Sequence, residues 1–410
     1  MKINRGVFVS LAIAATVANT GLVFAKPSVP VIMNRDSFVL ETESILKVNR
    51  ATEPVSPMIA TLDLDSQTID QLFEAGDSAQ EAGDYIEAEI IWRRLLQRDP
   101  DNVSARVRLG EALHRQNRLE EAIQAYQSAI KLAPNFTVAH VNLGGAFADQ
   151  GDFEAAAASL RQAIEIDPYF MPAYNLLGAI LQEQGQLTEA IALTEQAIEI
   201  DPHWTVSHVL LGHLRIAQND FEAATAAFYQ ALNLTDMPGP RGSTDSLAYV
   251  GLGNLALSQG DLEEAASAYR RAADLDPSCV DAHVGLGAVL LTQRRFGDAI
   301  VCERRALELD PNEPWAHVNL GAALLAQGRL EEAIAAFHQT LALPNMQGMP
   351  ASTHTLAHTN LGYVLQLQGK LEEAIEEYRY ALQLDANFIP AQNALRAAER
   401  LLGGQSFPDD

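Results

Sequence analysis

The chain has 410 residues, with 28 Lys or Arg against 53 Asp or Glu, so its formal net charge at pH 7 is −25. A surface this acidic repels nucleic-acid phosphates and anionic lipid headgroups, so we expect no nucleic-acid partner. Two cysteines are too few for a disulfide framework.

The first 25 residues have the composition of a secretory signal peptide. Lys2 and Arg5 precede an apolar run over 7–18, and Val23-Phe24-Ala25 matches a small-residue cleavage site. An uncleaved anchor is the alternative, since 7–25 is just long enough for a short membrane span. We expect cleavage, no membrane span after signal removal, and an exported protein. The periplasm is the expected compartment, with the thylakoid lumen and the extracellular medium as alternatives.

Residues 26–65 show neither helical nor strand periodicity and are interrupted by four prolines. This composition predicts a mostly disordered spacer between the signal and the folded part of the chain.

From 66 to 388 a glycine and an alanine recur nine times, always twelve positions apart. The interval between glycines is 34 residues, extended twice to 41. A fixed period of this length predicts a stack of similar helix pairs, because each pair must bury its apolar face against the next. The glycines are Gly76, Gly110, Gly144, Gly178, Gly212, Gly253, Gly287, Gly321 and Gly362.

Each repeat has the pattern of two helices. In 314–346 the first helix is predicted to end at Gly328, where a left-handed backbone is least costly. The second carries an apolar stripe at helical spacing that includes Leu330, Ile334 and Phe337. The repeated glycine lies inside the first helix, where it is unfavourable unless a neighbour approaches closely. An aspartate is expected to cap the second helix in four repeats, at Asp84, Asp152, Asp220 and Asp261.

These features resemble the tetratricopeptide repeat (TPR), with its 34-residue period, Gly at position 8, Ala at position 20 and Pro at position 32. The resemblance implies an all-α fold, a right-handed superhelical α-solenoid of nine TPR helix pairs over 66–388. A capping helix is expected at 389–402, followed by a tail at 403–410. Repeats three to five and six to eight align at an offset of 109 residues, and each triplet ends in a longer loop, near 237–245 and 346–354.

Side chains suited to catalysis or metal binding do not form a recognisable motif. The sequence has no GxSxG, P-loop or HExxH pattern, so we expect no enzyme, cofactor or metal site. Five histidines occupy position 4 of the first helix, and they are open to two interpretations: a ring of zinc ligands, or flat packing groups that hydrogen-bond a neighbour. We favour packing. These are His140, His208, His283, His317 and His358.

In arrays of this family the first helices line a concave groove. Here that face is mixed and charged in the first two repeats and largely apolar in repeats five to eight. A continuous apolar strip is a candidate partner-binding surface, although tight curvature would instead bury it between adjacent helices. The apolar candidates are Val209, Leu247, Val250, Val284, Leu291, Trp315, Val318 and Leu325.

Asn142, Asn319 and Asn360 occupy position 6 of the first helix. They are similar to the asparagine ladder in the TPR superhelix of protein O-linked N-acetylglucosamine transferase, without its catalytic domain. That resemblance implies that these amides hold an extended peptide, since an amide both donates and accepts. The ladder is interrupted here, for example by Leu176 and Gly285.

The expected function is that of an exported TPR scaffold that binds a protein or peptide partner in its concave groove. By analogy with the family it would act in the assembly or organisation of an envelope or membrane complex. The alternative is a glycan or small-ligand receptor, or a non-catalytic substrate-binding subunit of a glycosyltransferase-type enzyme.

Overall fold

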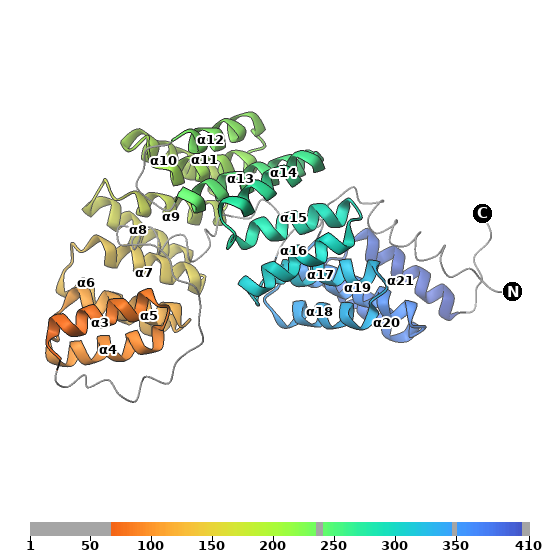
Figure 1. The fold of residues 1–410 in the computed structure, drawn as a ribbon, viewed down its shortest axis with the longest axis horizontal. Coiled ribbons are helices and arrows are strands. Elements are labelled where there is room, and N and C mark those ends of the chain that lie inside the picture. Colours follow the sequence, from red (N-terminus) through yellow and green to blue (C-terminus); the bar gives the residue numbers. More distant parts are fainter. Residues whose placement is uncertain (1–66, 235–240, 347–350, 404–410) are drawn as a thin grey trace. The chain divides into compact units, whose positions relative to one another are not determined.

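The computed structural model describes residues 67–234, 241–346 and 351–403, and every regular element in these ranges is an α-helix (Figure 1). The predicted signal peptide, the spacer and the residues after 403 lie outside the described ranges. The all-α solenoid fold class is confirmed for the described ranges, which contain nine helix pairs and one further helix.

The chain divides into two compact units between Pro240 and Arg241, within the first predicted long loop. We call the described parts the N-terminal array and the C-terminal array. The N-terminal array has five pairs: α3 (Ile69–Glu81), α4 (Tyr85–Arg98), α5 (Val103–Arg115), α6 (Leu119–Leu132), α7 (Thr137–Gln150), α8 (Phe153–Ile166), α9 (Met171–Glu183), α10 (Leu187–Ile200), α11 (Thr205–Ala217) and α12 (Phe221–Asn233).

The C-terminal array has four pairs and the helix in the range given for the cap, α21. Its helices are α13 (Arg241–Ser258), α14 (Leu262–Leu275), α15 (Val280–Thr292), α16 (Phe296–Leu309), α17 (Pro314–Ala326), α18 (Leu330–Ala342), α19 (Thr353–Leu367), α20 (Leu371–Leu384) and α21 (Ile389–Leu402).

Within each array a first helix packs on its own second helix, which packs on the first helix of the next pair. Successive first helices also contact each other, as α9 does α11 and α15 does α17. Within an array, successive second helices contact each other less than successive first helices do. The first helices therefore form the inner side of each array, as expected for stacked pairs that curve.

The repeated glycine makes room for a large side chain sixteen residues later, on the second helix. A Cβ added at Gly110, Gly212 or Gly321 would lie 2.5 Å from the aromatic ring of Tyr126, Phe228 or Phe337 respectively. Such a distance is far inside van der Waals contact. The close approach predicted from the sequence is confirmed, and the neighbour is mainly a buried side chain rather than the backbone of the facing helix.

The turn between the two helices of a pair uses a left-handed residue in all nine described repeats. Six are glycines, including Gly328 with φ of 75°, as predicted. The other three are Asn117, Asn219 and Arg294, with φ of 59°, 62° and 62°. The four predicted aspartate caps are confirmed, since each carboxylate accepts a hydrogen bond from the backbone N–H three residues later.

The long loops are shorter than their predicted ranges. Helix α13 begins at Arg241, so residues 241–245 are helical, not loop. Helix α19 begins at Thr353, where the Ser352 side chain accepts from the N–H of Thr355. The ends of this second loop are joined by the N–H of Thr353, which donates to the carbonyl of Met346 at 2.9 Å.

Candidate functional site

Most of the apolar candidates are buried in the structure. Trp315 and Val318 are 0 % exposed, Val209 and Val284 1 %, and only Leu247 is partly exposed. Val250, Leu291 and Leu325 are also buried. Such side chains have almost no surface to offer a partner, so their burial favours the alternative interpretation, that they pack between adjacent helices.

Direct packing of the first helices explains this burial. In the C-terminal array α15 contacts both α13 and α17, and its residues from Val284 to Leu291 are all buried. Valine at position 5 and alanine at position 9, as in Val284 and Ala288, are small enough to let neighbouring first helices touch. The inner side of this array is therefore largely a continuation of its core.

The three candidate asparagines do not form one surface. Asn319 is 0 % exposed and Asn360 7 %, and each has an amide nitrogen without a hydrogen-bond partner in the described chain. Asn142 is partly exposed, and its Nδ2 donates to Oε1 of Glu111 at 2.8 Å. In repeat seven the same position is Gly285, which faces the second helix of the preceding pair, since an added Cβ would lie 2.4 Å from the ring of Tyr269. Only Asn142 therefore belongs to an accessible polar cluster.

That cluster lies on the first helices of repeats one to three, and we call it the polar face. It consists of Asp77 on α3, Arg108, Glu111 and His114 on α5, and Asn142 and Asp149 on α7.

Glu111 is the centre of the polar face. It accepts from Arg108 Nη1 at 3.1 Å and from Gln80 Nε2 at 2.9 Å, in addition to the bond from Asn142. Gln80 in turn accepts from the indole of the buried Trp92 at 3.1 Å. One carboxylate thus joins three successive first helices, and a chain of hydrogen bonds anchors it to the core of the first repeat.

The members of the polar face are neither free nor fully buried. Arg108 contacts Asp77 at 3.3 Å, and these side chains are 28 % and 33 % exposed. Partial burial raises the pKa of Asp77, although Arg108 opposes the shift. Between α5 and α7, Nε2 of His114 lies 2.8 Å from Oδ2 of Asp149, with both side chains about one-fifth exposed. These pairs hold donors and acceptors in fixed positions at the surface.

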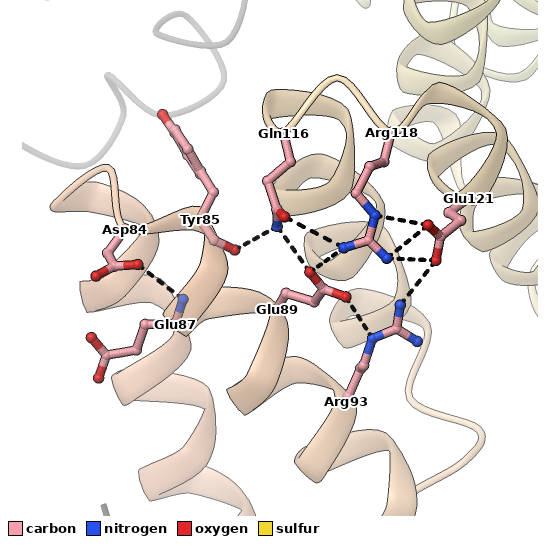
Figure 2. A network of polar contacts seen from close by, with 8 residues as sticks. All are labelled: Asp84, Tyr85, Glu87, Glu89, Arg93, Gln116, Arg118 and Glu121. Atoms are coloured by element: carbon pink, nitrogen blue, oxygen red, sulfur yellow. Dashed lines mark hydrogen bonds and ion pairs between the residues drawn. The ribbon is translucent and has the colours of Figure 1, made fainter. Parts of the chain in front are cut away.

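A second polar network joins the first two repeats at their inter-helix turns, and Figure 2 shows its members. Gln116 donates to the carbonyl of Tyr85 at 2.9 Å and to Glu89 at 3.0 Å, while Arg118 bridges Glu89 and Glu121. Burial alone would raise the pKa of Glu89, but hydrogen bonds from Arg93, Gln116 and Arg118 outweigh it and lower that pKa. The donors of Gln116 and Arg118 are bound to acceptors within the network itself. We therefore assign the network a structural role, which is to hold repeat two on repeat one.

The position-4 histidines bond the preceding turn. Nε2 of His140, His208 and His317 lies 2.8–2.9 Å from the carbonyl oxygen of the proline six residues earlier, as does that of His283 at 3.1 Å. Tyr174 makes the same bond to Pro168. His358 follows the second long loop and instead contacts Glu377. The packing interpretation accounts for all five.

Metal binding and thiol chemistry find no support in the described part of the chain. Among these residues there is no cluster of three or more His, Cys, Asp or Glu side chains able to hold a metal ion. Cys279 and Cys302 are free thiols, and burial raises the pKa of each to about 11. Nor does any helix within 67–234, 241–346 and 351–403 combine the length and apolarity needed to cross a bilayer.

The polar face was visible in the sequence only as charged residues at groove positions. Its centre, Glu111, and the pair His114–Asp149 could not be selected, because the bonds join residues 31 to 35 positions apart.

Models of known families match most of the repeat region. Tetratricopeptide repeat models match residues 73–135, 250–314, 302–335 and 355–388, and a MalT-like TPR region matches 134–278. No curated protein matches the sequence.

One solved structure shows the same fold, and two others align over smaller parts of the chain. The Cut9–Hcn1 hetero-tetramer of the APC/C aligns over 82 % of this chain and 67 % of that chain, with 17 % identity and a TM-score of 0.55. MamA aligns over 39 % and 93 % with 25 % identity and a TM-score of 0.35. A thermophilic TPR protein of Thermus thermophilus aligns over 46 % and 99 % with 22 % identity and a TM-score of 0.40.

Proposed function

The chain belongs to the tetratricopeptide repeat family, and we propose that it is an interaction scaffold whose protein or peptide partner contacts the polar face of the N-terminal array. The observation that carries this proposal is the cross-repeat cluster around Glu111. It presents donors and acceptors of both charges on the inner side of three successive repeats.

Preorganisation supports the polar face as a binding surface. Asn142, Arg108 and His114 are each held by a carboxylate, so ordering them on binding costs little further side-chain entropy. Their partial exposure leaves room for additional hydrogen bonds to a partner's backbone or side chains. The described C-terminal array has its inner side chains on α15 and α17 buried, so it offers a partner much less.

We also propose that the scaffold is exported and organises an envelope or membrane complex. The support is the signal-like composition of residues 1–25 together with a repeat array devoted to interaction. Fusing residues 1–30 to a reporter that is active only after export tests this part. An inactive reporter with the native leader would contradict it.

Site-specific crosslinking tests the binding surface. A photoreactive residue placed at His114 or Asn142 should crosslink a discrete partner in envelope extracts, which mass spectrometry then identifies. The same residue at Arg161 on α8, which is 50 % exposed, is the matched control. With the partner identified, Asn142→Arg combined with His114→Glu should weaken its binding at least about tenfold, while Arg161→Glu leaves it unchanged. Equal crosslinking at 114 and 161, or unchanged binding by the double variant, would overturn the polar face as the contact surface.

A further inference from the structure

Glu303, on the second helix of repeat seven, stands where other repeats place a packing side chain. It lies sixteen residues after Gly287, and a Cβ added at that glycine would meet its Oε1. The corresponding residues in the other eight repeats are Trp92, Tyr126, Leu160, Thr194, Phe228, Tyr269, Phe337 and Tyr378. All are buried, and only Glu303 can ionise in the acidic to neutral range.

The surroundings of Glu303 do not satisfy its polar atoms. The side chain is 0 % exposed, and neither carboxyl oxygen has a hydrogen-bond partner in the described chain. Asn319 faces it from α17, is also 0 % exposed, and has neither amide atom bonded. The Asn319 amide would favour the ionised carboxylate, but it is not placed at hydrogen-bonding geometry. Two buried polar groups thus meet at the contact between α16 and α17, in a cluster otherwise made of apolar side chains.

The described neighbouring helices bring no cation to neutralise this carboxyl. Burial raises the pKa of Glu303 well above its ordinary value, and Glu313, which caps α17, acts in the same direction. On α16 the adjacent Cys302 is a neutral thiol, and the exposed Arg304 and Arg305 contact Glu332 and Glu308 instead. The remaining titratable groups on α15 and α17 are Asp281, His283 and His317, and both histidines bond proline carbonyls at the helix starts.

We propose that Glu303 makes the junction between repeats seven and eight proton-sensitive. With a proton on Glu303, the junction holds a neutral acid beside a neutral amide, which can hydrogen-bond after a small rotation. Without it, the junction holds an uncompensated charge in an apolar core, and the contact between α16 and α17 loosens.

The direction of the pH effect follows from linkage. A carboxyl that is harder to ionise in the folded state stabilises that state below the ordinary pKa of glutamate, and this stability is lost as pH rises toward the folded pKa. The junction is therefore expected to be tighter near pH 5 than near pH 8. Each unit by which folding raises the pKa of Glu303 corresponds to about a tenfold change in the equilibrium constant for local opening of the junction.

Hydrogen exchange read by mass spectrometry tests this in the full chain. Peptides from α16 and α17 are compared between the wild type and Glu303→Gln at the same pH, so that intrinsic exchange rates cancel. The ratio of the variant's protection factor to that of the wild type should rise by about tenfold or more between pH 5 and pH 8. Peptides from α5 and α6 in the N-terminal array should show no such change.

Two further variants complete the test. Glu308→Gln makes the same change at an exposed position of α16, where the side chain is 66 % exposed, and should keep the wild-type pH dependence. Glu303→Phe places at this position the residue that repeat eight has, and should abolish the dependence even if Glu303→Gln folds poorly. A wild-type pH dependence that persists in both Glu303 variants would overturn the proposal, as would loss of it in Glu308→Gln.

Discussion

The first three repeats and the C-terminal array are built on the same 34-residue pattern but use the inner side of the stack differently. In the C-terminal array α15 packs directly on α13 and α17, and valine and alanine occupy the contact. In the first repeats α3 and α5 contact each other much less, and Asp77, Arg108 and Glu111 lie between and beside them.

The difference follows from side-chain size and polarity at a few positions. Alanine at position 9 lets two first helices approach, whereas a carboxylate at the same position requires polar partners such as Arg108 and Asn142. The same fold therefore gives a closed apolar interior in one region and an accessible polar face in another. Repeat identity alone does not reveal where a partner would bind.

The largest expected effect concerns Trp315, a candidate contact residue that is fully buried. Trp315→Ala should destabilise the C-terminal array by about 3–5 kcal/mol, the usual cost of deleting a large core side chain. Ser104→Ala changes the same repeat position in the exposed part of α5 and should have an effect within about 0.5 kcal/mol. Urea unfolding followed by circular dichroism measures both. A stable Trp315→Ala protein with lost partner binding would restore Trp315 as a contact residue.

A smaller effect, and a gain, is expected at the left-handed turns. Arg294 adopts φ of 62° in the C-terminal array, a conformation that costs a residue with a Cβ about 1–2 kcal/mol. Arg294→Gly should therefore raise the free energy of unfolding by up to about 1 kcal/mol, since glycine's freedom in the unfolded chain offsets part of the relief. Asn219→Gly in the N-terminal array should gain less, because asparagine tolerates this region. Thermal unfolding checks the pair, and an Arg294→Gly protein less stable than the wild type would contradict the assignment.

The smallest effect concerns the polar face. Glu111 and Asn142 are partly exposed, so a double-mutant cycle with Glu111→Ala and Asn142→Ala should give a coupling energy of about 0.5–1 kcal/mol. The same cycle on Glu111 and Lys131, which no described bond joins, should give a value near zero. Equal couplings in the two cycles would show that the bond between Glu111 and Asn142 does not tie repeat two to repeat three.

The fold could be predicted from the sequence because it depends on a pattern repeated nine times. Gly321 and Phe337 form one contact that recurs with small variations, and Asp152 caps a helix by a bond to a backbone three residues away. Such local relations are readable from spacing.

The candidate site could not be read in the same way. Whether Val284 faces a groove or a neighbouring helix depends on how closely first helices approach, which is set by side chains 34 residues away in either direction. Asn142 and Asn319 have the same place in the repeat, yet one bonds Glu111 near the surface and the other is buried beside Glu303. The difference lies in the residue that the preceding repeat brings to each asparagine. Aligning the nine repeats by sequence shows Glu303 as the one acidic residue at a position that is uncharged in the other eight repeats.

The match between Tyr269 and Gly285 limits how such a protein can change by recombination. The Tyr269 ring occupies space that any side chain at 285 would need. Moving repeat seven elsewhere, or placing another repeat after repeat six, would bring a side chain such as Leu210 or Asn319 against that ring. Repeats of similar sequence are therefore not interchangeable modules here. An unequal crossover that placed another repeat after repeat six would meet this steric penalty even if it kept the reading frame and the 34-residue period.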